Sequence, residues 1–333
     1  MNHRRNFSVA VALLALAATP STALVQPGDS PINDRAFRHD QLHVGDRYER
    51  ASAVSADRSQ AVRNLSSLSV SPQSSRLDLR SGRWGTLMPV TPMLPGRNSL
   101  SWDSFEVDAP DAAGLRTVAW DAFVSYLRDH EDALLIDVSE LTNPGNVAVH
   151  EDGRLIQINA PRTVGGVPVR NSFLTAVIRH GNLILFGSRN WGDVETSSAP
   201  TLTENEARAA VLSHLSPFLT TGWNKSGLTF VPLASDDEAI GEGVEYRLAW
   251  ALQPRLDGEL GKWEALVDAH SGELLAFEDT THYASTREVE GGIYPVSNNG
   301  IGAEGTEQAD FPMPFADVAN AGNDFVTDSG GNL

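Results

Sequence analysis

The chain has 333 residues, a formal net charge of −18 and no cysteine. A chain of this length has room for roughly two domains. The lack of cysteine excludes disulfides and thiolate metal sites, so burial of apolar side chains must hold the fold together. Nucleic acid and anionic membrane surfaces would repel so acidic a chain, and we expect neither as a partner.

The N-terminus, MNHRRNFSVAVALLALAATPSTA, has the features of an export signal. Arg4 and Arg5 precede an apolar run from Val9 to Ala18, and small residues precede a cleavage point at Leu24. The run of about ten residues is too short to span a bilayer, so we expect no membrane insertion. Residues 1–23 therefore predict a secreted or periplasmic protein, with the Sec and twin-arginine routes both open.

The pattern predicts an α+β fold of two small helix-plus-antiparallel-sheet units. We expect residues 24–110, rich in Ser, Pro, Arg and Asp, to form a polar, largely irregular and mobile N-terminal linker. The first unit, residues 111–199, begins with a helix and continues with three strands. The helix carries an apolar stripe at Leu115, Val118, Ala119, Ala122, Phe123, Tyr126 and Leu127, and the last two strands turn at Gly181-Asn182.

The second unit, residues 200–281, starts at a capping box formed by Thr203 and Glu206. A strand, VEYRLAWAL, and a hairpin turning at Asp268 to Gly272 follow the capped helix. Residues 282–333 change to a Gly-, Asn- and Pro-rich composition, which predicts a processing linker and the start of a β-rich module. The final FVTDSGGNL indicates a strand without a return partner, as in the front part of a longer protein.

Several polar and aromatic groups could form sites, but the sequence around each favours a structural role. His39 and His43 in HDQLH have i, i+4 spacing, but Asp40 is shorter than the glutamate of a zinc motif and no third ligand follows. We therefore expect no catalytic, cofactor-binding or metal-binding residue in this chain. The remaining groups are interpreted as a solvated helix end (His130, Glu131, Asp132), a solvated loop (Asp236, Asp237, Glu238), a turn acceptor (Asp268), core aromatics (Trp250, Trp263) and a turn residue that could also touch a partner (His180).

Two stretches resemble parts of known secreted precursors. GVPVRNSFLTAVIRHGNLILFGSRNW resembles the fungalysin/thermolysin propeptide motif, and YRLAWALQPRLDGELGKWEALVDAHSGELLAFED resembles a PepSY-type unit. They occur in the order found in precursors of fungalysin-type secreted zinc metalloproteases, separated by the capped helix TLTENEARAAVLSHL, and together span about residues 111–280.

This resemblance implies an inhibitory and folding-assisting propeptide that acts on a metalloprotease catalytic domain, in cis or in trans. The chain lacks the HExxH zinc motif, so we expect no enzyme activity from it and expect zinc only in a catalytic domain outside this sequence. Release is expected within residues 282–292. The alternative is a stand-alone exported PepSY-type inhibitor or binding protein. The oligomeric state and the cognate protease stay open.

Overall fold

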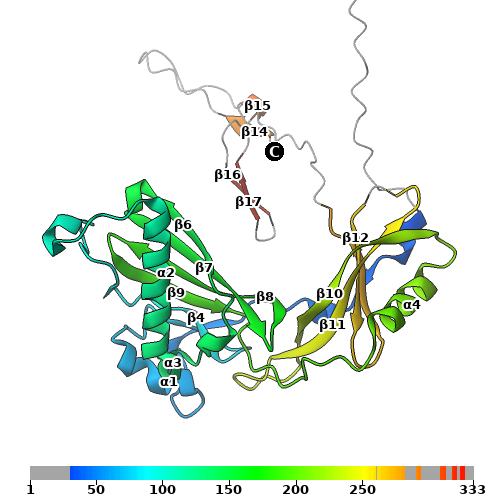
Figure 1. Cartoon of the computed structure of the whole chain (residues 1–333), viewed down its shortest axis with the longest axis horizontal. Helices are drawn as coiled ribbons and strands as arrows, with labels where there is room; N and C mark the ends of the chain where they lie inside the picture. Colours follow the sequence, from blue (N-terminus) through cyan, green and yellow to red (C-terminus); the bar gives the residue numbers. More distant parts are fainter. Residues whose placement is uncertain are drawn as a thin grey trace, which may run out of the picture. The chain divides into compact units, whose positions relative to one another are not determined.

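A computed structural model describes residues 31–259 and 261–281, together with the backbone of four short strands near the C-terminus (Figure 1). Those strands form two separate hairpins, β14 (Glu290–Ile293) with β15 (Gln308–Pro312), and β16 (Asp317–Asn320) with β17 (Asn323–Val326). The final strand that we predicted to be unpaired therefore pairs with β16. The predicted export signal, residues 1–23, and residues 282–289 of the expected release segment lie outside the described residues.

Residues 28–280 form one unit, and its first half is built on helix α2 (Ala112–Asp129). Asp111 begins the helix by accepting a hydrogen bond from the Gly114 amide at 2.7 Å, which satisfies a free donor of the first turn. The predicted helix is confirmed, but its buried stripe is rotated from the predicted one. Trp120 is buried, whereas Val118 is 37 % exposed.

The inner face of α2 packs on an antiparallel sheet of β6 (Asn146–His150), β7 (Leu155–Val164), β8 (Val167–Arg179) and β9 (Asn182–Arg189). The predicted β8–β9 hairpin is confirmed, but its turn lies at His180 and Gly181, whose φ angles are 47° and 74°. Two successive positive φ angles are typical of the tight turn that fits the twist of a hairpin. Strand β6 was not predicted.

The second half packs helix α4 (Glu204–Leu215) on β10 (Thr220–Ala234), β11 (Val244–Leu256), β12 (Trp263–Asp268) and β13 (Leu274–Asp279). The predicted capping box is present, because Thr203 Oγ1 accepts from the Glu206 amide and Glu206 accepts from the Thr203 amide. Strand β10 was missed, since its first half, TTGWNKSG, has no regular apolar alternation.

The two predicted units share one sheet, in the order β1-β13-β12-β11-β10-β8-β7-β6 with β9 beside β8. The junction is the parallel pairing of β8 with β10, at Val169 opposite Phe230. The fold is therefore α+β with a mostly antiparallel sheet and few helices, as predicted. The boundary that we placed between residues 199 and 200 separates two helix-packed halves of one sheet.

The N-terminal segment differs most from the prediction, because residues 31–105 pack against the sheet at β13 and at β9. Trp84 and Leu87 are fully buried in the same core as α2. Buried and exposed residues follow one another here without a regular period, so the burial of Trp84 and Leu87 leaves no periodic signal in the sequence. The segment contains β1 (Phe37–Arg38), β2 (Tyr48–Arg50), α1 (Gln60–Asn64), β3 (Arg76–Asp78), β4 (Arg83–Thr86) and β5 (Thr91–Pro92), while the short α3 (Glu131–Leu134) follows α2.

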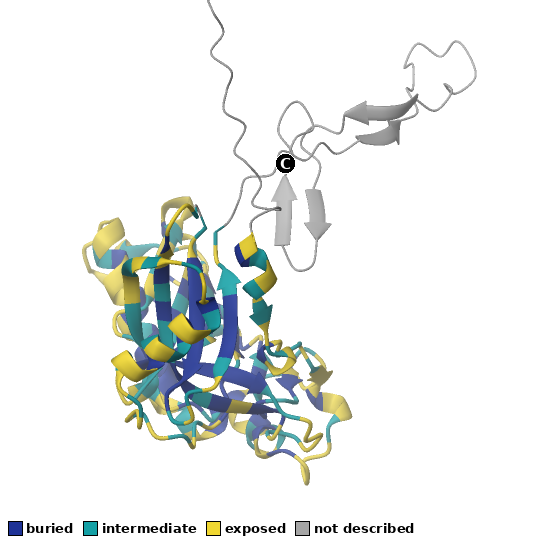
Figure 2. Cartoon of the chain, turned by 90° about the vertical axis from the view of Figure 1, so that its right-hand side faces the viewer, coloured by how far each residue is buried: buried dark blue, intermediate teal, exposed yellow. Residues whose placement is uncertain are grey.

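This segment also covers strand edges. β1 pairs with β13 and β5 pairs with β9, while Leu87 bridges to Phe186 of β9. Buried residues follow the strands through both halves (Figure 2). None of the described helices is long and apolar enough to cross a membrane.

Candidate functional site

The face of β6, β7 and β8 that points away from α2 carries amide and hydroxyl side chains. Ile156, Ile158 and Ala160 of β7 point toward the helix and are buried, whereas Gln157 and Asn159 alternate with them on the other face. The register places Asn146, Asn159 and Thr175 in one row across the three strands. Part of this face forms a shallow depression of about 440 Å³, lined by Asn146, Val147, Ala148, Gln157, Ile158, Asn159, Thr175, Ala176 and Val177.

The charge of this face differs from that of the whole chain. The outward positions of the three strands contain no carboxylate, and Arg179 and His150 lie at one end of them. In a chain of net charge −18, such a face is less repulsive to an acidic partner than the average surface. It is lined by amide, hydroxyl and small apolar groups that can bind a polar peptide surface.

A second depression, of about 480 Å³, lies on the other side of β6 against α2. Its wall includes Trp120, whose indole nitrogen donates to Asn143 Oδ1 at 2.8 Å and so fixes the loop before β6. A Cβ at Gly145 would collide with the Trp120 ring, which explains why this position is a glycine. Arg116 and Asp121 of α2 supply the charged groups of this wall.

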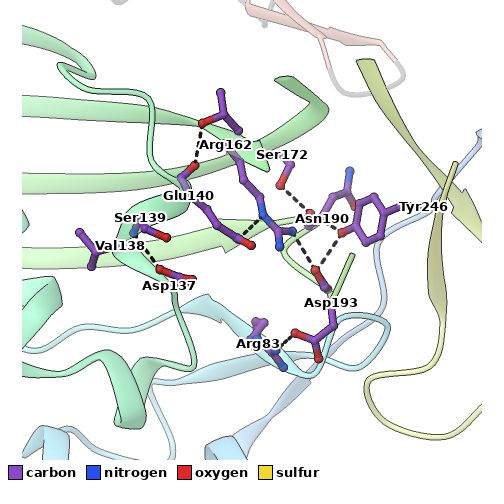
Figure 3. Close-up of polar contacts among 12 residues, drawn as sticks. Arg83, Asp137, Val138, Ser139, Glu140, Arg162, Ser172, Asn190, Asp193 and Tyr246 are labelled. Atoms are coloured by element: carbon purple, nitrogen blue, oxygen red, sulfur yellow. Dashed lines mark hydrogen bonds and ion pairs between the residues drawn. The ribbon is translucent and has the colours of Figure 1, made fainter. Parts of the chain in front are cut away.

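The two halves are joined by a buried arginine that the sequence analysis missed (Figure 3). Arg162 of β7 is 2 % exposed, and its guanidinium bonds Glu140 Oε2 at 2.7 Å and the Gly192 carbonyl at 2.8 Å. It also lies 4.7 Å from the centre of the Trp191 ring. These contacts satisfy the charge with a carboxylate, a carbonyl and an aromatic face, as a buried arginine requires.

Tyr246 of β11 contacts the same cluster from the second half of the sheet, and we call the cluster around Arg162 the joint. Its hydroxyl donates to the Asn190 carbonyl at 2.6 Å and accepts from the Gly192 amide at 2.9 Å. Burial raises the pKa of Tyr246 to about 12, despite the opposing effect of Arg162. The hydroxyl is therefore neutral at physiological pH and acts here as a fixed hydrogen-bonding group.

A depression of about 320 Å³ beside the joint is lined by acidic residues. Asp193 there pairs with Arg83 at 2.7 Å. Across the described part of the chain, no group of three or more His, Asp or Glu side chains is arranged to hold a metal ion. The other carboxylates of this depression are those of Glu195, Asp237, Glu242 and Glu245.

The histidines with ligand-like spacing or charged neighbours, His39, His43 and His130, lie in structural positions. His39 and His43 flank a 3₁₀ turn, Asp40–Leu42, rather than one face of an α-helix, and His39 contacts Glu273 at 3.6 Å. His130 ends α2, where its ring stacks on Tyr126 with centroids 4.4 Å apart. The structure does not bring these three histidines together.

The tip of the β8–β9 hairpin, which we considered as a partner contact, is covered by the chain itself. The Gly181 carbonyl accepts from the amides of Met93 and Leu94, at 2.8 and 2.9 Å, and the His180 carbonyl accepts from the Asn98 amide. These bonds hold residues 93–98 around the turn. The backbone acceptors at His180 and Gly181 are thus used within the molecule.

The aspartate of the second hairpin, two tryptophans and an acidic loop have the structural roles that follow. Asp268 Oδ1 accepts from the amides of His270 and Ser271 at 2.9 and 2.8 Å, which confirms its turn role. Trp263 is buried and stacks on Phe277 at 4.7 Å, and Trp250 donates to the Leu202 carbonyl at 2.9 Å. Asp236, Asp237 and Glu238 are exposed, as predicted for a solvated loop.

No family model matches the sequence, and no curated protein matches it. Among solved structures, the Bacillus megaterium YpeB C-terminal domain is similar, with 12 % sequence identity and a TM-score of 0.27 over 62 % of this chain and 82 % of that one.

Proposed function

We propose that this chain is the inhibitory and folding-assisting propeptide region of a secreted zinc metalloendopeptidase precursor. The observation that carries the proposal is the order and spacing of two sequence stretches, one resembling the fungalysin/thermolysin propeptide motif and the other a PepSY-type unit. The first stretch forms β8 and β9, and the second forms β11 to β13 of the same sheet.

The proposed mechanism uses surface shape and backbone groups rather than reacting side chains. A sheet face with amide and hydroxyl side chains offers hydrogen bonds to a folding catalytic domain, and a free strand edge offers main-chain donors and acceptors. Binding to the native-like state of the protease would stabilise it during folding and restrict its cleft afterwards. Zinc would be held by the catalytic domain and by no group of this chain.

Titration of the purified mature chain against a fungalysin-type protease tests the proposal directly. We expect saturable inhibition of peptide hydrolysis, and faster recovery of activity when the denatured protease refolds in the presence of the chain. A chain that neither inhibits the protease nor alters its refolding would refute the assignment. Reading the gene beyond Leu333 for an in-frame HExxH separates a covalent propeptide from the alternative of an inhibitor that acts in trans.

A further inference from the structure

Strand β6 provides an edge of the sheet that is open to another chain. In the described residues the strand order ends at β6, whereas β1 and β5 at the other ends are only two residues long. β6 pairs with β7 over five residues without a bulge. Its sequence, NVAVH, contains no proline, lysine, arginine or acid. Natural edge strands usually carry such features to prevent pairing with other chains, and β6 lacks them.

The surface on both sides of β6 is hollowed in a way that fits an added strand. The depression on the outward face and the one against α2 share Val147 in their linings, so the edge lies between them. Side chains of an added strand point alternately to the two faces of a sheet. They would therefore enter the amide-lined depression on one side and the depression at Trp120 on the other.

Charge decides against a second copy of this chain as the occupant. Two molecules that each carry a net charge of −18 repel one another. β6 contains no acid, lysine or arginine, so pairing two copies of this strand would form no salt bridge to offset the repulsion. The amide and hydroxyl groups of Gln157, Asn159 and Thr175 instead fit polar side chains of a different protein. Because no carboxylate lines this depression, an acidic segment would meet no like charge there.

We infer that β6 is a docking edge, to which an extended, polar segment of the metalloprotease catalytic domain adds as a further strand. This inference rests on the proposed function and specifies which part of the molecule makes the contact. Main-chain hydrogen bonds of β6 supply the attraction, and the two depressions select the alternating side chains.

Adjacent proline substitutions in the full mature chain test the inference. Successive amides of a strand point to opposite sides, so one of Ala148→Pro and Val149→Pro removes a hydrogen bond to β7 and the other removes an outward amide. The variant that keeps the wild-type melting temperature is the one that alters the free edge. We expect it to bind a fungalysin-type protease, inactivated at its zinc-motif glutamate, at least about tenfold more weakly.

Hydrogen exchange gives a second readout that needs no variant. Outward amides within residues 146–150 should exchange more slowly in the complex, and Leu212→Asn, on the exposed side of α4, should leave the affinity unchanged. If the protease binds while these amides stay unprotected and the folded proline variant binds as wild type, the docking edge is refuted but the propeptide function stands. If the protease does not bind at all, both proposals fail. Self-association of the wild-type chain that the same proline abolishes would identify a second copy as the occupant and overturn the inference.

Discussion

The guanidinium of Arg162 in β7 lies 5.7 Å from the ring centre of Tyr246 in β11, so the two halves of the sheet meet at an arginine–aromatic contact. The parallel pairing of β8 with β10 is short, with Val169 opposite Phe230. The side-chain contacts of Arg162 therefore add to a short main-chain pairing between the two halves of the sheet. A rigid joint matters for the proposed function, because a partner that contacts both halves binds best when their relative orientation is already set.

Replacing Arg162 by Met should lower the free energy of unfolding by about 3 kcal/mol, because Glu140 loses its partner and the Gly192 carbonyl loses its donor. Urea denaturation monitored by tryptophan fluorescence measures this change. Replacing Arg189 by Met, in the exposed pair with Asp46, is the matched control, with an expected loss below about 1 kcal/mol. Equal losses for the two variants would contradict a special role for the buried arginine.

Ionisation of Tyr246 should lower the free energy of unfolding at alkaline pH. Its pKa is raised from 10.0 to about 12 in the folded protein, so the stabilisation is complete below pH 10 and is lost as the pH rises through about 12. Tyr126, whose pKa burial also raises to about 12, acts in the same range. Urea melts at pH 9 and 11, with phenolate absorbance followed in parallel, check the direction.

Tyr246→Phe separates the two tyrosines. At pH 8 the variant should be about 1–3 kcal/mol less stable, since the Gly192 amide and the Asn190 carbonyl lose their partner. Between pH 9 and 11 its stability should decline less steeply than that of wild type. An unchanged slope would assign the alkaline loss to Tyr126 or to other groups.

The sequence predicted those elements whose signal is local. α2 and α4 have N-terminal caps and apolar spacing, and the β8–β9 hairpin has a glycine-containing turn between apolar strands. Asp268 likewise bonds to amides within three residues. Such features depend on neighbours in the chain, so one sequence suffices to find them.

Features that depend on distant contacts were missed. Trp84 and Leu87 lie in a stretch without a regular apolar period, and only the core formed with α2 explains their burial. The sequence did contain one indication that Arg162 is buried. Arg162 continues the inward alternation of Ile156, Ile158 and Ala160 along β7, and an arginine at such a position indicates a buried, paired charge.

The ionised carboxylate of Asp78 should lower the free energy of unfolding at neutral pH. Burial raises its pKa above 3.8, and the nearby Asp46 adds to the effect, while hydrogen bonds from the Ser81 hydroxyl and from backbone amides oppose it. With a raised folded-state pKa, its favourable contribution is present below pH 3.8 and is lost as the pH rises through the folded value. Asp78→Asn should therefore raise the melting temperature at pH 7 and have little effect at pH 3.5.

A carboxyl titration by NMR checks the cause of this effect. Ser81→Ala removes the 2.6 Å hydrogen bond to Asp78 Oδ2, so it should raise the pKa of Asp78 further. A wild-type value at or below that of an unperturbed aspartate would show that the hydrogen bonds outweigh burial. In that case Asp78→Asn should destabilise the protein at pH 7.

The N-terminal segment gives the sharpest difference between sequence and structure, and Leu87 tests it. Leu87 is fully buried and exchanges two backbone hydrogen bonds with Phe186, at 2.7 and 2.9 Å. Leu87→Ala should lower the free energy of unfolding by about 2–4 kcal/mol, because it leaves a cavity in the core shared with α2. The adjacent Met88 is 48 % exposed, and Met88→Ala should change stability by less than about 0.5 kcal/mol. Equal, small effects of the two substitutions in urea denaturation would mean that residues 31–105 are the mobile linker that their composition suggests, with the outer edge of β9 uncovered.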